Sequence, residues 1–348
     1  MKRSKKYVFL YSLVLLIVGL GLIGQTAAAQ PDKAQWPRSM IIEGMSVGSS
    51  AYMVAAALGK AIKDELGIRT QVTAGVPPPQ EVENVGKGES HIGYTMGEMP
   101  YDAFRGDYSW KGKQQRDLRI MSHVISVTMH FITWPGTGID SAAGLKGKTF
   151  MGDEARVRFL IGFTKAVLAE NGLTEKDVKI ITWREYGEQI SFIRMKLGDA
   201  IFLETGVGTA PVAELDRTMD LKFIPFKKNE IEAALTKNPF LYPETIPAGS
   251  YTQLKQDYHT AGASVSQVVN VNTPDSLIYE ICKILYDKPG RFESVHATWG
   301  KFDIKRATMP RTAPYHAGAV RYYKEKGIWT QELDTWQKKT LQESGLEK

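Results

Sequence analysis

Short apolar runs alternate with stretches of helical spacing along most of this chain of 348 residues, and this alternation constrains the fold more than any other feature. Parallel strands need long crossover connections, which are usually helices. The order therefore predicts an α/β protein with mostly parallel sheets. The predicted strands are residues 40–43, 69–73, 91–95, 129–134, 148–151, 179–182, 200–203 and 222–225.

Three helices have clear limits in the sequence. The first has apolar residues at a spacing of four, a serine that can cap its start and a glycine that can close its end. These residues are Val54, Leu58, Ile62 and Leu66, with Ser49 or Ser50 before them and Gly67 after them. The other two helices are predicted at residues 159–170 and 275–286. Prolines and glycines make residues 239–262 a long irregular connection, typical of a segment that crosses between two lobes.

The loop at residues 44–50 (GMSVGSS) lies between the first strand and the first helix. Glycines let backbone N–H groups approach a ligand closely, serine hydroxyls add donors, and the helix N-terminus favours an anionic or strongly polar group. Ser46, Gly48, Ser49 and Ser50 are therefore candidate ligand contacts. The alternative is that the serines only cap the helix, a role that is compatible with ligand binding.

The first thirty residues have the pattern of an export signal. Four basic residues between Lys2 and Lys6 precede an apolar run over residues 7–23, and three alanines end at Ala29. This order predicts a signal peptide over residues 1–29 that is cleaved after Ala29, and hence a periplasmic location. An uncleaved membrane anchor is the alternative.

Charge and cysteine content exclude several kinds of partner and cofactor. The formal net charge of +6 falls to about +2 once the basic residues of the signal are removed, and the remaining basic residues are scattered, so nucleic acid is not implied. The single cysteine, Cys282, lies on a helical apolar pattern and is predicted to be buried and inert. Histidines are dispersed, and we expect neither a metal nor another cofactor.

Six short motifs occur in the order found in the TAXI family, and the chain resembles that family over nearly its whole predicted mature length. The TAXI proteins are the extracytoplasmic solute-binding proteins of tripartite ATP-independent periplasmic (TRAP) transporters. The motifs are residues 44–52 (GMSVGSSAY), 88–93 (GESHIG), 101–106 (YDAFRG), 145–148 (LKGK), 247–251 (PAGSY) and 316–323 (HAGAVRYY).

The resemblance implies a two-lobe, type II-like periplasmic-binding-protein fold that closes over a small carboxylate or amino acid, with the ligand cleft between lobes joined by hinge strands. It also implies delivery to the integral membrane subunits of a TRAP permease, without catalysis. We expect lobe 1 at residues 38–132 plus 266–348 and lobe 2 at residues 133–265. The hinge crossings are expected at residues 129–134 and 263–272.

Three departures from the family pattern concern the ligand. Residues 96–98 (MGE) stand where the family tends to have Gln-Ser-Asp, and residues 155–158 (ARVR) replace a small Gly-Ser-Gly-Thr loop. Residues 204–208 (ETGVG) place an acid where the family is usually apolar or small. A neutral cradle has thus become a charged one, so the ligand need not be the family's glutamate-like solute.

Arg156 and Arg158 are candidate carboxylate contacts, because a guanidinium matches two oxygens and stays charged at any working pH. The alternative is that neither arginine contacts the ligand: Arg156 forms a salt bridge with Asp153 or Glu154, and Arg158 lies on a solvated face. An unchanged dissociation constant in Arg156→Ala would refute the ligand role.

Glu98, Glu204 and Thr205 are candidate polar contacts from two other loops. Glu98 suits an ammonium or hydroxyl group, or is simply a loop carboxylate in water. Glu204 follows a predicted strand and would project toward a cleft. Two aromatic candidates remain open in the same way: Tyr52 stacks on the ligand or packs in the helix, and Trp134 lines the cleft or belongs to the core.

Two other functional classes fit part of the pattern. Residues 44–48 match the G-x-S-x-G nucleophile elbow of serine hydrolases, with Ser46 as the nucleophile. Too few residues precede this motif for the strands and oxyanion loop of that fold. An exported sensor that presents its ligand-bound surface to a membrane receptor uses the same closure as a transport protein.

Overall fold

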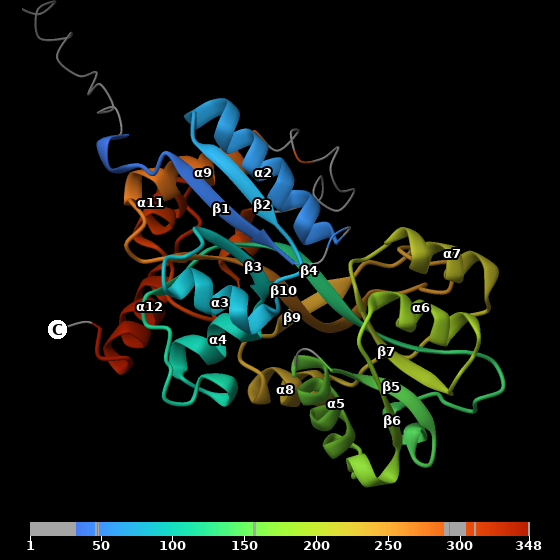
Figure 1. Ribbon diagram of the computed structural model, residues 1–348. Coiled ribbons are helices and arrows are strands. Elements are labelled where there is room, and N and C mark those ends of the chain that lie inside the picture. The colour runs from blue at the N-terminus through green and yellow to red at the C-terminus, as the bar shows by residue number, and fades with distance from the viewer. Residues whose placement is uncertain are drawn as a thin grey trace, which may run out of the picture. The chain divides into compact units, whose positions relative to one another are not determined.

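The computed structural model describes residues 33–45, 47, 49–155, 158–288, 292, 304–309 and 311–346 (Figure 1). The chain divides into two units, Met1–Gln35 and Trp36–Lys348. Of the first, only the short 3₁₀ helix Lys33–Gln35 is described, so the predicted signal peptide lies outside the described residues. The fold below is that of Trp36–Lys348.

The described residues of this unit form one ten-stranded sheet in the order β2-β1-β3-β10-β4-β7-β5-β6, with β8 beside β4 and β9 beside β10. Strands β1, β2 and β3 are parallel to one another, and so are β5, β6 and β7. The bounds are β1 Ser39–Gly44, β2 Arg69–Thr73, β3 Ile92–Met96, β4 Leu118–Thr133, β5 Thr149–Glu154, β6 Lys179–Trp183, β7 Ala200–Thr205, β8 Lys222–Phe223, β9 Tyr242–Ile246 and β10 Tyr258–Asn270. The predicted α/β class is confirmed.

Two long strands join the parallel groups. β4 and β10 pair with each other in antiparallel register, β10 also pairs with β3, and β4 also pairs with β7. The chain therefore passes from the first group to the second along β4 and returns along β10. The predicted crossings at residues 129–134 and 263–272 overlap these strands, although the pairing at the centre of the sheet is antiparallel, not parallel as expected.

Strands β4 and β9 differ most from the sequence prediction, and β10 begins inside the segment that was predicted to be irregular. β4 begins at Leu118, eleven positions before the predicted strand, because buried polar residues such as Ser122 and His123 interrupt its apolar pattern. β9 lies inside the segment that was predicted to be irregular. It pairs with β10 alone, and Pro243 is tolerated there because an edge strand does not need every N–H group.

Helices cover both parallel groups. The bounds are α2 Ser50–Leu66, α3 Pro78–Gly86, α4 Glu98–Arg105, α5 Phe159–Glu170, α6 Tyr186–Arg194, α7 Ala210–Thr218, α8 Lys228–Lys237, α9 Asp275–Tyr286, α11 Ala317–Glu325 and α12 Gln331–Glu343. Helices α2, α3 and α4 pack on β1 to β3, and α9 packs on α2 and β4; in the second group α5 and α6 pack on β5 to β7, and α7 packs on α6 (Figure 1). Both remaining predicted helices, now α5 and α9, have the predicted limits.

The core beneath the second group is aromatic. The ring of Phe202 on β7 lies 4.9 Å from Phe131, 5.2 Å from Phe150, 5.5 Å from Phe163 and 5.6 Å from Phe226, measured between ring centroids. Burial of one such side chain contributes about 2 kcal/mol. This cluster gives the loops that follow β5 and β7 a rigid support.

Cys282 is buried on α9, as predicted. No helix among the described residues is long and apolar enough to cross a membrane. The lobe limits expected from the sequence, residues 38–132 with 266–348 and residues 133–265, stay a prediction.

Candidate functional site

The candidate site is built by the loops that follow the carboxyl ends of the parallel strands, where open α/β sheets bind their ligands. In the first group these loops follow β1, β2 and β3. The carbonyl of Met45, in the first loop, accepts the N–H of Gly75, in the second, at 2.9 Å. In the second group the loops follow β5, β6 and β7 and lead into α5, α6 and α7.

The two groups meet at Arg158, the residue just before α5. Its backbone N–H donates to Oε1 of Glu98 at 2.8 Å. Its guanidinium donates twice to Asp102, from Nε to Oδ2 at 2.8 Å and from Nη2 to Oδ1 at 2.5 Å. Glu98 and Asp102 are four residues apart on α4, so their side chains share one face of that helix.

Two aromatic rings hold the Arg158 guanidinium in place. Its central carbon lies 3.9 Å from the ring centroid of Tyr108 and 5.1 Å from that of Phe240. The side chain of Arg158 is 27 % exposed, whereas that of Asp102 is only 4 % exposed. The bidentate pair with the buried Asp102 and the two rings together fix the position of the Arg158 side chain. An exposed ion pair on the surface would leave it much freer.

Glu98 is in an unfavourable position for a charged carboxylate. Burial raises its pKa to about 8, although the N–H and the charge of Arg158 act in the opposite direction, and the nearby Asp102 and Glu154 raise it further. Its second oxygen, Oε2, is buried and has no hydrogen-bond partner among the described residues. The contact with Arg158 thus only partly offsets the cost of burying this carboxyl group.

A polar cluster forms where β7 ends. The hydroxyl of Thr205 lies 2.9 Å from that of Tyr186, at the start of α6, and 3.1 Å from that of Thr209. Glu204, its neighbour, is half-buried opposite Met129 of β4. These contacts connect the loops that follow β6 and β7.

His130 and Tyr251 connect the same region to β4. The imidazole donates from Nδ1 to the carbonyl of Thr128 at 2.8 Å, because a carbonyl oxygen can only accept. In the neutral ring Nε2 then accepts from the hydroxyl of Tyr251 at 3.1 Å. Burial lowers the pKa of His130 to about 4, which supports the neutral form. The Tyr251 oxygen also accepts the N–H of Gly208 at 3.1 Å.

The loop after β1 is described only in part. Ser46 and Gly48 lie outside the described residues, and so does Arg156 in the second group. Ser49 caps α2, since its hydroxyl accepts the N–H of Tyr52 at 3.1 Å. Ser50 and Tyr52 are half-buried in the first turn of α2, and their contact with a ligand stays a prediction.

Trp134 is 5 % exposed and packs edge-on against Phe192 at 6.1 Å. Of the two positions considered for it, the cleft and the core, Trp134 therefore occupies the core. Arg158 pairs with Asp102 and does not form a solvated face. Glu98 is buried and is not a loop carboxylate in water. The structure thus brings Glu98 and Arg158 together, and places Trp134 and Thr205 in the interior.

Sequence reasoning missed two residues of this region. Asp102 belongs to a motif that was recognised, but only the packing of α4 against α5 shows its partner. Gln189 on α6 is fully buried, and neither atom of its amide has a hydrogen-bond partner among the described residues. A single glutamine in an amphipathic helix carries no signal that would have identified it.

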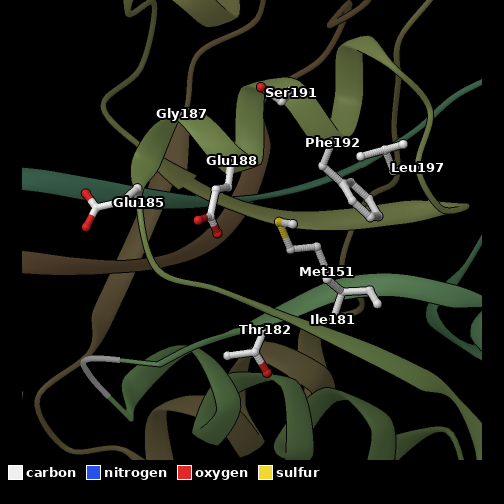
Figure 2. Close-up of a pocket in the computed structure, with 9 residues that line it drawn as sticks. All are labelled: Met151, Ile181, Thr182, Glu185, Gly187, Glu188, Ser191, Phe192 and Leu197. Atoms are coloured by element: carbon white, nitrogen blue, oxygen red, sulfur yellow. The ribbon is translucent and has the colours of Figure 1, made fainter.

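A cavity of about 610 Å³ lies in the second group, between α6 and strands β5 and β6 (Figure 2). Apolar side chains such as Met151 and Phe192 line it together with Glu185 and Glu188. None of the candidate ligand residues named above lines this cavity, so we do not assign the solute to it. Among the described residues, no group of three or more His, Cys, Asp or Glu side chains could hold a metal ion.

Two parallel strand groups joined by two long antiparallel strands define the fold of the two-lobe periplasmic solute-binding proteins. A putative periplasmic sulfonate-binding protein, SsuA, of a sulfonate ABC transporter from Methylobacillus flagellatus superposes with a TM-score of 0.50 at 14 % identity, over 89 % of this chain and 95 % of that one. The aliphatic sulphonate binding protein SsuA from Escherichia coli has a TM-score of 0.46 at 10 % identity, over 86 % and 92 %. Identities this low show the fold alone.

The chain belongs to the NMT1-like family, whose model matches residues 42–327. The match is not specific to the TAXI family, so the TRAP partnership expected from the motif order stays a proposal. The fold is that of solute-binding proteins and not of serine hydrolases, and the alternative of catalysis by Ser46 is dropped.

Proposed function

We propose that this protein is an exported solute-binding protein, which captures a small carboxylate-bearing or polar solute by lobe closure and delivers it to a membrane transporter. One observation carries the proposal. The two strand groups are connected through β4 and β10, and their carboxyl-end loops meet at the contact of Arg158 with Glu98 and Asp102. Relative movement of two such groups about two crossing strands is a hinge closure.

We propose a TRAP permease as the receiving transporter. The order of the six motifs supports this partner, because it is the order of the TAXI family. An ABC transporter is the competing partner, since the superposed Methylobacillus protein is named as a component of one. Recovery of the protein with its membrane partner by crosslinking in intact cells, followed by mass spectrometry, distinguishes the two, and recovery of a receptor kinase alone would favour the sensor.

Thermal unfolding tests solute capture. The protein without its leader is refolded to remove bound solute and is heated with organic acids, sulfonates, amino acids or sugars. A solute at a hundred times its dissociation constant adds about 2.7 kcal/mol, which raises the midpoint by several degrees. X-ray scattering at saturating solute should show a closed, compact protein. If no solute in a broad panel raises the midpoint, the proposed function is wrong.

The leader is tested separately. Protein isolated from the periplasm should begin at Gln30, the residue after Ala29. An N-terminal sequence that starts at Met1 would mean that the segment is retained as an anchor.

A further inference from the structure

The start of α5 combines two features that bind anions. A helix N-terminus has backbone N–H groups without partners in the helix, and the aligned peptide dipoles add partial positive charge there. α5 is twelve residues long, and the side chain of Arg158, at its N-cap, makes no capping hydrogen bond. The guanidinium of the same residue is a planar donor for two oxygens.

Carboxyl groups of α4 accept hydrogen bonds from both of these donors, the N-terminus of α5 and the Arg158 guanidinium. Glu98 accepts the backbone N–H of Arg158, and Asp102 accepts two donors of its guanidinium. The two acids lie on one face of α4, one helical turn apart, and both are buried. The start of α5 is a position suited to an anionic ligand. In this structure two carboxyl groups of the first strand group, those of Glu98 and Asp102, occupy it.

Glu98 fits this place only in part. Its Oε1 has the N–H of Arg158, but Oε2 is fully buried without a hydrogen-bond partner among the described residues. An unpaired buried oxygen destabilises the folded state, because it has lost its hydrogen bonds to water. The neighbouring acids Asp102 and Glu154 and the loss of water also raise the pKa of Glu98. The contact therefore joins α4 to the start of α5 but leaves one oxygen of Glu98, Oε2, without a hydrogen bond.

We infer that Glu98 and Asp102 are an internal substitute for the anionic group of the solute. They hold α4 against the start of α5 while no solute is bound, and a carboxylate or sulfonate binds there by displacing Glu98. The inference rests on the proposed closure of the lobes, and it names the anionic group as the part of the solute that α5 recognises. Glu98 itself shows that a carboxyl group fits the position.

Competition of this kind has a measurable consequence. The apparent affinity for an anion is reduced by the fraction of molecules in which Glu98 occupies the site. Removal of the Glu98 carboxyl group should therefore strengthen anion binding. A Glu98 that contacts a cationic group of the solute would give the opposite result.

The first measurement is the separation of the two strand groups without solute. Spin labels are attached to cysteines at Lys60 of α2 and Lys176 before β6, which are both exposed, and distances are measured by pulsed electron resonance. The native Cys282 is buried and is not labelled under native conditions. The full mature protein should show short distances, and Glu98→Ala combined with Asp102→Asn should shift molecules to longer ones. We expect the ratio of closed to open molecules to fall at least tenfold.

The second measurement is titration with methanesulfonate and acetate as anionic probes and with ethylammonium as a cationic one. Glu98→Ala alone should bind an anionic probe at least tenfold more tightly than the wild type, and the probe should restore the short distances in the double variant. Glu98→Gln, which keeps an acceptor for the Arg158 N–H, should resemble the wild type without solute. Ethylammonium should have no effect on any variant.

A matched control removes an ion pair elsewhere. Glu214→Gln breaks the contact with Arg194 at 2.7 Å, which is exposed and lies within the second strand group, and should leave distances and binding unchanged. Identical distances in the wild type and the double variant would overturn the inference, and so would weaker anion binding in Glu98→Ala. Failure of the whole solute panel would refute the proposed function instead, while the solute-free distances would still decide the role of Glu98 and Asp102.

Discussion

The imidazole of His130 and the phenol of Tyr251 meet edge-on, with their planes inclined by 76° and the hydroxyl oxygen 3.1 Å from Nε2. Tyr251 also accepts the N–H of Gly208 and stacks on Phe223 at 4.8 Å. One hydroxyl thus connects β4 to the loop that follows β7. This contact belongs to the region where β4 leaves β10 and pairs with β7.

Removal of this hydroxyl should destabilise the protein. In Tyr251→Phe, the buried Nε2 of His130 and the N–H of Gly208 lose their partner, and we expect the free energy of unfolding to fall by about 1–3 kcal/mol. Urea denaturation at pH 7 measures the change. Tyr108→Phe is the control, because Tyr108 is largely exposed, and it should change stability by less than about 0.5 kcal/mol. Equal stability of Tyr251→Phe and the wild type would mean that the hydroxyl contributes nothing.

Acid should weaken the fold through His130. Burial lowers its pKa to about 4 from an ordinary value near 6.5. A group whose pKa is depressed in the folded state contributes stability above its unfolded pKa, and that stability is lost as the pH falls through the folded pKa. We therefore expect a loss of roughly 3 kcal/mol from this residue between pH 6.5 and pH 4.

The contribution of His130 is isolated by substitution. His130→Gln should lower the free energy of unfolding at pH 7 but flatten its decline toward pH 4, as measured in urea at several pH values. His259→Gln, on the exposed end of β10, should keep the full decline. An identical decline in His130→Gln and the wild type would contradict the assignment.

Alkali should weaken the fold through Glu81. This carboxyl group on α3 is fully buried and accepts the N–H of Tyr94, and its pKa is raised well above the ordinary value by burial and by the nearby Glu43. A raised folded-state pKa contributes stability that is fully present below the unfolded pKa and is lost as the pH rises through the folded pKa.

Glu81→Gln keeps an oxygen for the N–H of Tyr94 and removes the buried acid. We expect this variant to be more stable than the wild type at pH 8 and to lose less stability than the wild type between pH 5 and pH 8. Glu83→Gln on the same helix, which breaks only a surface contact with Lys87, should follow the wild type. Urea denaturation across that pH range measures both, and a Glu81→Gln curve parallel to the wild type would rule out a buried acid as the cause.

Arg156 is expected to contact the solute. Arg156→Ala should weaken binding of the solute identified by thermal unfolding at least tenfold, or about 1.4 kcal/mol, measured by calorimetric titration. Arg184→Ala, an exposed arginine after β6, is the matched control and should bind normally. Normal binding by both variants would leave Arg156 without a ligand role.

Local patterns predicted much of the fold. The limits of α5 and α9 match the structure, Ser49 caps α2, and Gly67 closes it with a φ of 74°. These features depend on residues a few positions apart. Strand β4 was predicted far too short because its first half carries polar side chains that are buried only through pairing with β10.

The candidate site was predicted less completely than the fold. Glu98 and Arg158 were identified as charged loop residues, but as separate ligand contacts and not as partners. Asp102 was overlooked because its role depends on a residue 56 positions later in the chain. Gln189 was missed because burial of a helical glutamine cannot be read from spacing alone.

The sequence by itself determined the alternation of strands and helices, the caps of α2 and the charged character of the loops that follow β3, β5 and β7. Capping, periodicity and composition are local, so neighbouring residues are enough to specify them. Only the tertiary structure decided that Glu98 and Asp102 occupy the start of α5 and that Tyr251 binds His130. Such contacts depend on how β4 and β10 carry the chain between the two strand groups, and burial then makes each unmade hydrogen bond costly.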